Sequence, residues 1–294
     1  MVDLTAIILT KNEEKNVEKC ITSIKPIAKR IVVIDSFSDD KTVEIAKKNG
    51  AEVFQNAFKN YATQFNWGLD NTNIDTTWVL RIDADEEFTT ELCEEINNDL
   101  PSLDKNITGM SINLRVVFMG KWLKHGGMYP WKLLRIFRTD AGRIENRNMD
   151  EHIMLSYGVM GAFKHDFIHH DFKNLEYWTH KHNWYSNREV KDYFEHLEMP
   201  EQSMQNQWAM EKRKMKNGIY YKLPKFLRSH LYFVYRYYFK LGFLDGTEGK
   251  IFHFLQAYWY RFLVDAKIYE CELTGTRYGE QGSLDSLHRG GGKL

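Results

Sequence analysis

The chain has 294 residues, of which 43% are hydrophobic and 14% aromatic, so we expect a substantial folded core and exclude global disorder. Lys and Arg together number 40, as do Asp and Glu, and a formal net charge of zero argues against a nucleic-acid-binding protein that neutralises many phosphates. Three cysteines, Cys20, Cys93 and Cys271, form no CxxC pair, which is typical of free thiols in a reducing compartment.

The first hundred residues alternate between short apolar runs and amphipathic stretches. We expect strands at residues 5–9, 30–34, 52–55 and 78–82. We expect helices in the stretch that ends at Ile24 and at residues 42–49 and 61–70, with a cap at 38–40. This alternation predicts a mostly parallel α/β sheet with helices on both faces, in which ligands bind beyond the carboxyl ends of the strands. Asp35 and Asp83 stand at two such ends.

Residues 109–118 and 131–138 are expected to form further strands, on either side of a loop that contains Gly126 and Gly127. Beyond residue 172 the composition changes to helical stretches rich in Tyr, Trp, Phe, Lys and Arg. We therefore predict a domain at 1–175, a helical extension at 176–281 and a disordered tail at 282–294.

No charged leader precedes the first strand, and the most apolar late stretch, residues 251–264, is broken by polar side chains. We therefore expect neither a secretory signal nor a membrane-spanning helix.

The acidic run Asp83-Ala84-Asp85-Glu86-Glu87 directly follows the expected strand 78–82. Mg²⁺ and Mn²⁺ prefer oxygen ligands and commonly bridge one or two carboxylates to substrate phosphates. An acidic helix N-terminus is the competing explanation, and it would be favoured for an isolated Asp-x-Asp. The preceding strand and the second strand-end carboxylate, Asp35, favour a metal site.

Three segments together resemble the family 2 glycosyltransferases, whose fold is GT-A. They are Ile7-Ile8-Leu9-Thr10-Lys11-Asn12-Glu13-Glu14, Ile34-Asp35-Ser36-Phe37-Ser38-Asp39-Asp40-Lys41-Thr42 and Arg81-Ile82-Asp83-Ala84-Asp85-Glu86. The resemblance covers residues 4–172 and is strongest to bacterial enzymes that build lipopolysaccharide cores and capsular or O-antigen chains. It implies an inverting transfer of a sugar from a nucleotide-sugar donor, with Mn²⁺ or Mg²⁺ as cofactor.

The resemblance also implies roles for individual residues. Asp35 would accept a hydrogen bond from the base, with uracil N3–H the expected donor, and Glu13 would reach the ribose. Asp83 would contact ribose or metal-bound water, and Asp85 would bind the metal. The full set of implied donor contacts is Thr10, Asn12, Glu13, Asp35, Gln64, Asn66, Arg81, Asp83 and Ala84. Thr10 and Asn12 could also cap the following helix.

Two later clusters complete the predicted site. An inverting transfer needs one base to remove the acceptor hydroxyl proton, and Asp150 and Glu151 are both candidates, with Glu151 favoured. A histidine near the end of the core would contact the metal or diphosphate, and His169 fits best. A strand turns His169 and His170 to opposite faces, so one of them is expected to be a ligand. A surface charge pair and a core histidine are the alternative explanations.

The basic, aromatic stretch 220–269 resembles an amphipathic surface that binds an anionic membrane. Residues 243–249 are expected to form the turn between two helices. We expect a lipid-linked glycan acceptor and a peripheral location on the cytoplasmic face of the bacterial membrane. A helical hairpin that packs on the core or makes a dimer is the alternative.

Two other functions remain open from the sequence. A nucleotidyltransferase would also use an α/β sheet and paired carboxylates, but would carry a Gly-rich basic loop where Thr10-Lys11-Asn12-Glu13-Glu14 stands. An inactive nucleotide-binding scaffold on the membrane would keep the same fold, and the complete carboxylate set argues against it.

Overall fold

The computed structural model describes residues 1–145, 152–170, 173–198, 218, 220–275 and 278. The described residues up to 170 form one compact unit, and those from 173 onward form a second. The division into domains at residue 175 stays a prediction, and the tail 282–294 lies outside the described residues.

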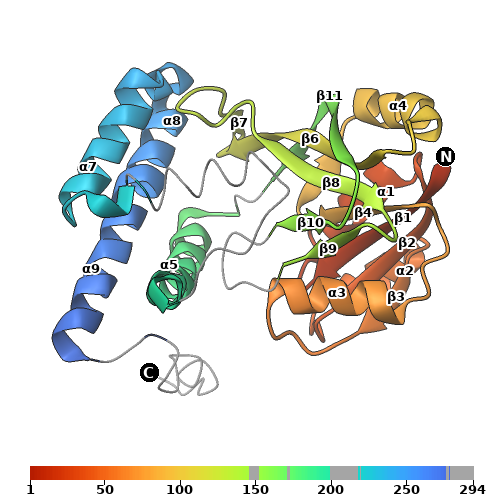
Figure 1. Ribbon diagram of the computed structural model, residues 1–294, viewed down its shortest axis with the longest axis horizontal. Coiled ribbons are helices and arrows are strands. Elements are labelled where there is room, and N and C mark those ends of the chain that lie inside the picture. Colours follow the sequence, from red (N-terminus) through yellow and green to blue (C-terminus); the bar gives the residue numbers. More distant parts are fainter. Residues whose placement is uncertain (146–151, 171–172, 199–217, 219, 276–277, 279–294) are drawn as a thin grey trace. The chain divides into compact units, whose positions relative to one another are not determined.

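A mixed sheet is the centre of the first unit (Figure 1), and its strand order is β3-β2-β1-β4-β8-β6-β11-β5, with β7 paired to β6. The strands are β1 Val2–Thr10, β2 Ala28–Asp35, β3 Glu52–Gln55, β4 Trp78–Asp83, β5 Glu86–Phe88, β6 Ile107–Phe118, β7 Lys121–Trp122, β8 Lys132–Arg138 and β11 Val159–His169. Strands β9 (Gly142–Ile144) and β10 (Ile153–Leu155) pair separately. The predicted strands in the first 138 residues are all present.

Six strands of this sheet bring their carboxyl ends to one edge, and the end of β3, Gln55, is one of them. Strands β3, β2, β1 and β4 are mutually parallel, whereas β8 is antiparallel to both β4 and β6. Strand β6 therefore has the direction of β4, and β11 is parallel to β6. With Gln55, the strand ends Thr10, Asp35, Asp83, Phe118 and His169 thus define one border of the sheet, which we call the carboxyl edge.

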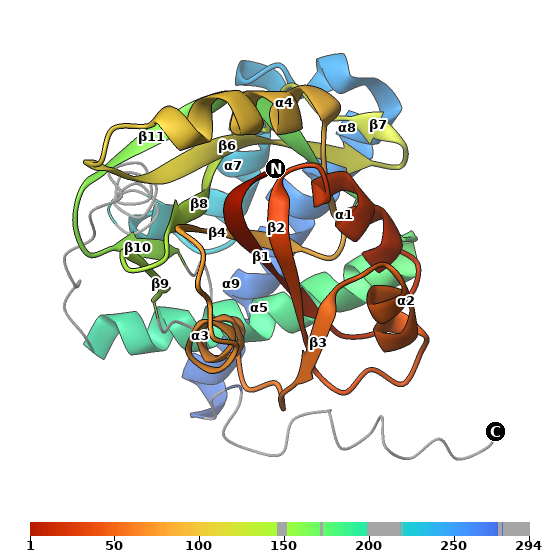
Figure 2. The same cartoon turned by 90° about the vertical axis from the view of Figure 1, so that its right-hand side faces the viewer.

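Helices cover both faces of the sheet, as predicted. Helices α1 (Val17–Ile24), α2 (Thr42–Lys48) and α4 (Thr90–Asp99) contribute to one core, and α3 (Tyr61–Asn71) contributes to a second. Figures 1 and 2 show α4 and α3 on opposite sides of the sheet. Helix α1 buries Val17, Cys20, Ile21 and Ile24, the three- and four-residue spacing that places side chains on one helical face.

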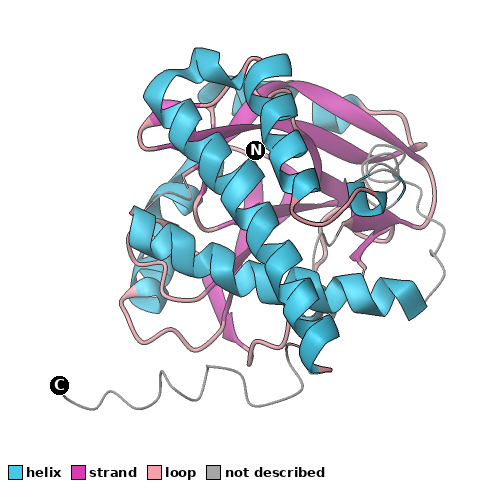
Figure 3. Ribbon diagram, turned by 90° about the vertical axis from the view of Figure 1, so that its left-hand side faces the viewer, coloured by secondary structure: helices cyan, strands magenta, loops and turns pink. Residues whose placement is uncertain are grey.

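The second unit is helical (Figure 3). Its elements are α5 Leu175–Glu198, η2 Tyr220–Lys222, α7 Leu227–Val234, η3 Tyr235–Phe239, η4 Gly242–Asp245, α8 Gly246–His253, η5 Phe254–Trp259 and α9 Tyr260–Thr274. Val190 of α5 packs in one buried cluster with Tyr260, Val264, Ile268 and Cys271 of α9. The turn predicted at 243–249 is shorter than expected, because α8 already begins at Gly246. None of the helices in the described part of the chain is long and apolar enough to cross a membrane.

Several cations of the basic stretch have partners inside this unit. The guanidinium of Arg228 pairs with Asp265, and both side chains are 1% exposed. Arg236 donates to Gln256, and Arg261 donates to Glu189 at 2.6 Å. These arginines are therefore part of the packing of this unit, because acceptors on neighbouring helices neutralise or bind them.

Candidate active site

Asp35 is the centre of a hydrogen-bonded polar cluster at the ends of β1 and β2. The parallel register sets Thr10 opposite Asp35, and Thr10 Oγ1 donates to Asp35 Oδ1 at 3.0 Å. The backbone N–H of Ser38 and the amide of Gln55 donate to Asp35 Oδ2 at 2.9 and 3.2 Å. Burial alone would raise the pKa of Asp35, but these hydrogen bonds hold the pKa below its usual value. Asp35 is therefore an ionised acceptor at neutral pH.

The loops after β1 and β2 are hydrogen-bonded to each other. The backbone N–H of Asn12 donates to Ser38 Oγ at 2.9 Å, and Asn12 Oδ1 accepts from the backbone N–H of Asp39 at 3.1 Å. The backbone N–H of Glu13 donates to Thr42 Oγ1 at 2.7 Å. Helix α1 begins only at Val17, so neither Thr10 nor Asn12 is its N-cap. Asp40 bonds the backbone N–H of Thr42 at the start of α2, where a cap was predicted.

Helix α3 supplies two amides that bind other parts of the protein. Gln64 is fully buried; its amide nitrogen donates to Ser36 Oγ at 3.1 Å and its oxygen accepts from Asn56 at 2.8 Å. Asn66 donates to the carbonyl of Ile144 at 2.8 Å and accepts from its N–H at 3.1 Å. Direct contact of Gln64 or Asn66 with the donor stays a prediction. The observed bonds position the Ser36 loop and β9.

Behind the acidic run lies a buried ion pair that the sequence analysis did not single out. The Arg135 guanidinium on β8 pairs with the Glu86 carboxylate and lies 3.6 Å from Asp83 Oδ2. Glu86 Oε2 accepts the backbone N–H of Asp83 at 2.9 Å. Burial raises the pKa of Glu86 to about 7, although Arg135 opposes this. An Arg in the middle of the otherwise apolar run 133–137 was the sequence signal for this pair.

Asp85 and His169 lie side by side at the carboxyl edge. Strand β11 pairs antiparallel with β5, with His169 opposite Glu86, and His169 Nε2 lies 3.2 Å from Asp85 Oδ2. His170 Nε2 instead lies 2.9 Å from Glu87 Oε2, and Lys19 also pairs with Glu87 at 2.7 Å. The two neighbouring histidines therefore contact different carboxylates.

The donor atoms here suit a hard divalent cation that is shared with a substrate. Asp83, Asp85 and His169 offer carboxylate oxygens and an imidazole nitrogen from adjoining strand ends. Among the described residues, no three His, Cys, Asp or Glu side chains are already gathered to hold a metal. A cation bound by one or two protein groups would take its other ligands from diphosphate oxygens and water, which is the usual arrangement for Mg²⁺.

Arg81 and Ala84, the other residues of the acidic motif that were predicted to contact the sugar donor, lie on either side of Asp83 in the chain. The Arg81 guanidinium lies 4.4 Å from the centre of the Tyr61 ring, at the start of α3. Ala84 is 4% exposed and belongs to the core under α1. The two residues thus join the Asp83 turn to helices on both faces of the sheet.

The two candidate bases, Asp150 and Glu151, lie outside the described residues. The described residues on either side are held together: Ile144 pairs with Ile153, and the backbone N–H of His152 donates to Glu145 Oε1 at 3.0 Å. Arg143 of β9 pairs with Asp70 of α3. The next residue of β9, Ile144, is hydrogen-bonded to Asn66, one turn earlier in α3. Strand β9 therefore runs towards the amino end of α3.

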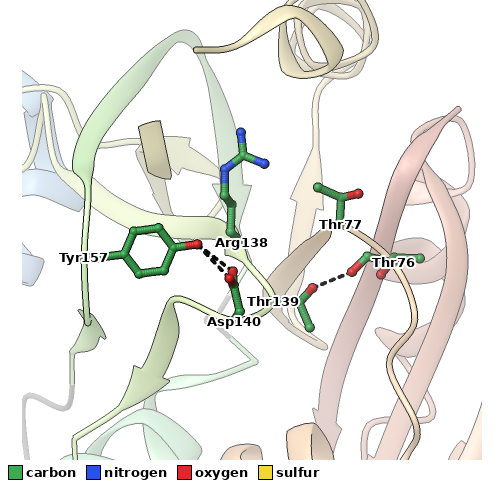
Figure 4. A pocket seen from close by; sticks show the side chains of 6 residues that line it. All are labelled: Thr76, Thr77, Arg138, Thr139, Asp140 and Tyr157. Carbon is green, nitrogen blue, oxygen red and sulfur yellow. Dashed lines mark hydrogen bonds between the residues drawn. The ribbon is translucent and has the colours of Figure 1, made fainter. Parts of the chain in front are cut away.

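A separate hollow of about 370 Å³ lies at the opposite sheet edge (Figure 4). It is lined by Thr76, Thr77, Arg138, Thr139, Asp140 and Tyr157. The Tyr157 hydroxyl donates to Asp140 at 2.8 Å, and Thr139 Oγ1 donates to the Thr76 carbonyl at 2.6 Å. Strand β4 separates this hollow from Asp83 by roughly 16 Å, so it is distinct from the carboxyl-edge site.

The chain is similar to known glycosyltransferases. Lipopolysaccharide core biosynthesis glycosyltransferase LpsC of Rhizobium meliloti is 25% identical over 281 residues, 91% of this chain and 92% of that protein. An uncharacterised glycosyltransferase of Rickettsia bellii is 43% identical over 93 residues, which are 32% of this chain and 31% of the relative.

A solved mannosyltransferase, PcManGT from Pyrobaculum calidifontis in complex with GDP-Man and Mn²⁺, shares the fold. Its TM-score is 0.52 at 13% identity, with 91% of this chain and 87% of that chain covered. The predicted GT-A fold, a mostly parallel sheet with flanking helices and C-terminal helices, is thereby confirmed. Residues 5–172 match the model described as glycosyl transferase family 2. The chain belongs to glycosyl transferase family 2.

Proposed function

We propose that this protein is an inverting glycosyltransferase that transfers a sugar from a nucleotide-sugar donor, with UDP as the expected nucleotide, in the presence of Mn²⁺ or Mg²⁺. The observation that carries the proposal is that two groups of polar side chains lie at the carboxyl edge. Asp35 with Thr10 forms an ionised hydrogen-bond acceptor, and Asp85 with His169 forms a cation-binding pair on the same border of the sheet. The nucleobase and the diphosphate of a nucleotide sugar need such separate, adjacent binding sites.

In this proposal Asp35 accepts the N3–H of uracil, and Glu13 reaches the ribose. Asn12 and Ser38 keep the two nucleotide loops in register. Arg135 and Glu86 fix the backbone N–H of Asp83, so that the Asp83 and Asp85 carboxylates stay at the strand end. A bound divalent cation would neutralise charge on the leaving diphosphate.

Inversion requires one general base and no protein nucleophile, because the acceptor hydroxyl attacks the anomeric carbon directly. Glu151, or Asp150 beside it, is assigned this role. The support is the direction of β9, which precedes this segment and runs towards the amino end of α3. Helix α3 in turn follows the carboxyl end of β3. That direction favours delivery of a side chain to the carboxyl edge.

The proposed acceptor is a lipid-linked glycan of a lipopolysaccharide or capsular polysaccharide, met by a peripheral enzyme on the cytoplasmic face of the membrane. The name of the LpsC relative, which aligns over 91% of this chain, supports the lipopolysaccharide assignment. The basic, aromatic helices of the second unit support the membrane location.

Calorimetric titration of UDP and of GDP, with Mn²⁺ and then with EDTA, tests the donor proposal. We expect UDP to bind with Mn²⁺ and to lose most of its affinity in EDTA. Preference for GDP would contradict the uridine assignment. Failure of both nucleotides to bind with either Mn²⁺ or Mg²⁺ would overturn the proposed function.

A further inference from the structure

The short connection between α7 and α8 has an unusual distribution of polarity. We call residues 235–245, comprising η3, η4 and the residues between them, the hairpin tip. Six of its large apolar or aromatic side chains are exposed: Tyr235 by 49%, Tyr238 by 56%, Phe239 by 76%, Leu241 by 45%, Phe243 by 43% and Leu244 by 53%. In water, side chains of these types are ordinarily buried, and a contiguous exposed set of them marks a contact surface.

Three polar side chains in or next to the tip, Arg236, Asp245 and His253, are buried. Arg236 is 6% exposed and donates to Gln256, and Asp245 is 3% exposed. His253 is fully buried, and no described residue bonds either of its ring nitrogens. A Cβ on Gly242 would lie 2.6 Å from the His253 ring, so the tip backbone is packed closely on this polar layer. Thus Arg236 and Asp245 of the tip lie inside, whereas its large apolar side chains lie outside.

Charge in this part of the sequence indicates what covers the apolar surface. No Asp or Glu occurs between Glu211 and Asp245, an interval that contains nine Lys or Arg residues. Arg228 and Arg236 are used internally, but Lys222 and Lys240 are exposed. The tip thus exposes the cation of Lys240, and its one acidic side chain, Asp245, is buried. Such an apolar surface complements an anionic bilayer, whose headgroups attract Lys and Arg and whose acyl boundary accepts aromatic rings.

We propose that the hairpin tip is the membrane-binding element of this protein and inserts into an anionic bilayer through Phe239, Leu244 and their exposed neighbours. This proposal deepens the proposed function and rests on it for its purpose, the approach to a lipid-linked acceptor. It specifies a short tip, and it differs from the sequence-based expectation that the whole stretch 220–269 forms one amphipathic surface. The buried Arg228, Arg236 and Asp265 give these helices a folded interior of their own.

Sedimentation of the full-length protein with vesicles tests the proposal. Vesicles of phosphatidylcholine alone are compared with vesicles that also contain phosphatidylglycerol, in the absence of nucleotide. We expect binding to the anionic vesicles. The double substitution Phe239→Ser and Leu244→Ser should lower the partition coefficient at least about tenfold, because each buried apolar side chain contributes about that factor. Lys240→Glu should weaken binding to anionic vesicles and make it less sensitive to lipid charge.

A matched control exists in the same unit. Tyr269 and Leu273 on α9 are 52% and 73% exposed, so Tyr269→Ser with Leu273→Ser removes comparable exposed apolar area outside the tip. This control should keep wild-type vesicle binding. Circular dichroism and UDP titration on every variant establish that the fold and the donor site are intact.

Three results would overturn the proposal: no binding of the wild-type protein to anionic vesicles, an equal loss in the α9 control, or a dimer in light scattering that Phe239→Ser and Leu244→Ser dissociate. The last result would assign the tip to self-association. The proposed function fails separately, if UDP and GDP do not bind while vesicle binding persists.

Discussion

His169 and His170 are adjacent in the chain but bond different carboxylates, Asp85 and Glu87. This makes them a matched pair of substitutions. His169→Ala should weaken Mn²⁺-dependent UDP binding by roughly 10–100-fold, because it removes a group from the cation-binding pair. His170→Ala should change this affinity less than about threefold. Calorimetry with both variants measures the difference, and equal effects would contradict the assignment of His169 to the metal.

The base can be assigned by separating binding from turnover. Glu151→Gln should leave UDP affinity with Mn²⁺ unchanged and lower kcat by at least about 100-fold, because a general base contributes about that factor. Asp85→Asn should instead abolish the effect of Mn²⁺ on binding. A fully active Glu151→Gln enzyme together with an inactive Asp150→Asn enzyme would transfer the role of base to Asp150.

Glu86 predicts a pH dependence of stability. Its folded-state pKa is raised to about 7, above the ordinary value of 4.5. Between these two values the folded protein binds more protons than the unfolded chain, so this group makes the free energy of unfolding fall as the pH rises. Between pH 4.5 and 7, the free energy of unfolding of the wild-type protein should fall by up to about 3 kcal/mol relative to that of Glu86→Gln. Urea unfolding at several pH values measures this, and parallel pH profiles would refute it.

At the scale of elements, two ion pairs attach α7 and the residues just before it to α9. The Arg228–Asp265 pair is buried. The second pair joins Lys225 to Glu272, whose side chains are 29% and 40% exposed. Arg228→Met should lower the free energy of unfolding by about 3–5 kcal/mol, because it leaves a buried carboxylate without its cation. Lys225→Met should cost less than about 1 kcal/mol. Urea unfolding followed by far-ultraviolet circular dichroism compares them, and similar costs would contradict the difference in burial.

Elements with a regular apolar pattern were predictable from the sequence, and those without it were not. Strand β1 is an apolar run, and 52–55 was predicted with the observed bounds. Strands β5, β9 and β10 have three residues each, too few to show a period. The π-helical segments η3 and η5 depend on packing, which no local pattern encodes.

For the site, the sequence indicated which residues end the strands, because strand direction places them at one border. It did not indicate which charges meet within the fold. Arg135 pairs with Glu86 across 49 positions, and Arg228 with Asp265 across 37. Such pairs are products of tertiary packing and must be observed.

At the scale of the whole molecule, each unit has its own buried cluster, so a ligand of one unit should stabilise that unit. UDP with Mn²⁺ at 100 times its dissociation constant should add about 2.7 kcal/mol to the first unit. Hydrogen exchange should show this protection in the slowly exchanging amides of β1 and β4 and not in those of α9. Equal protection of α9 would show that the two units unfold together.

The strand order also dictates when this protein can become active during its synthesis. Strand β11 lies between β6 and β5 in the sheet, yet it is the last of these strands to leave the ribosome. A nascent chain that has reached residue 158 already contains Asp35, Asp83 and Asp85, but β5 has no β11 to pair with and His169 has not been made. The loops after β1 and β2 can therefore form early, whereas the proposed cation-binding pair, Asp85 and His169, is completed only when the final strand enters the sheet. In the proposed mechanism, an unfinished chain would not transfer a sugar from its donor.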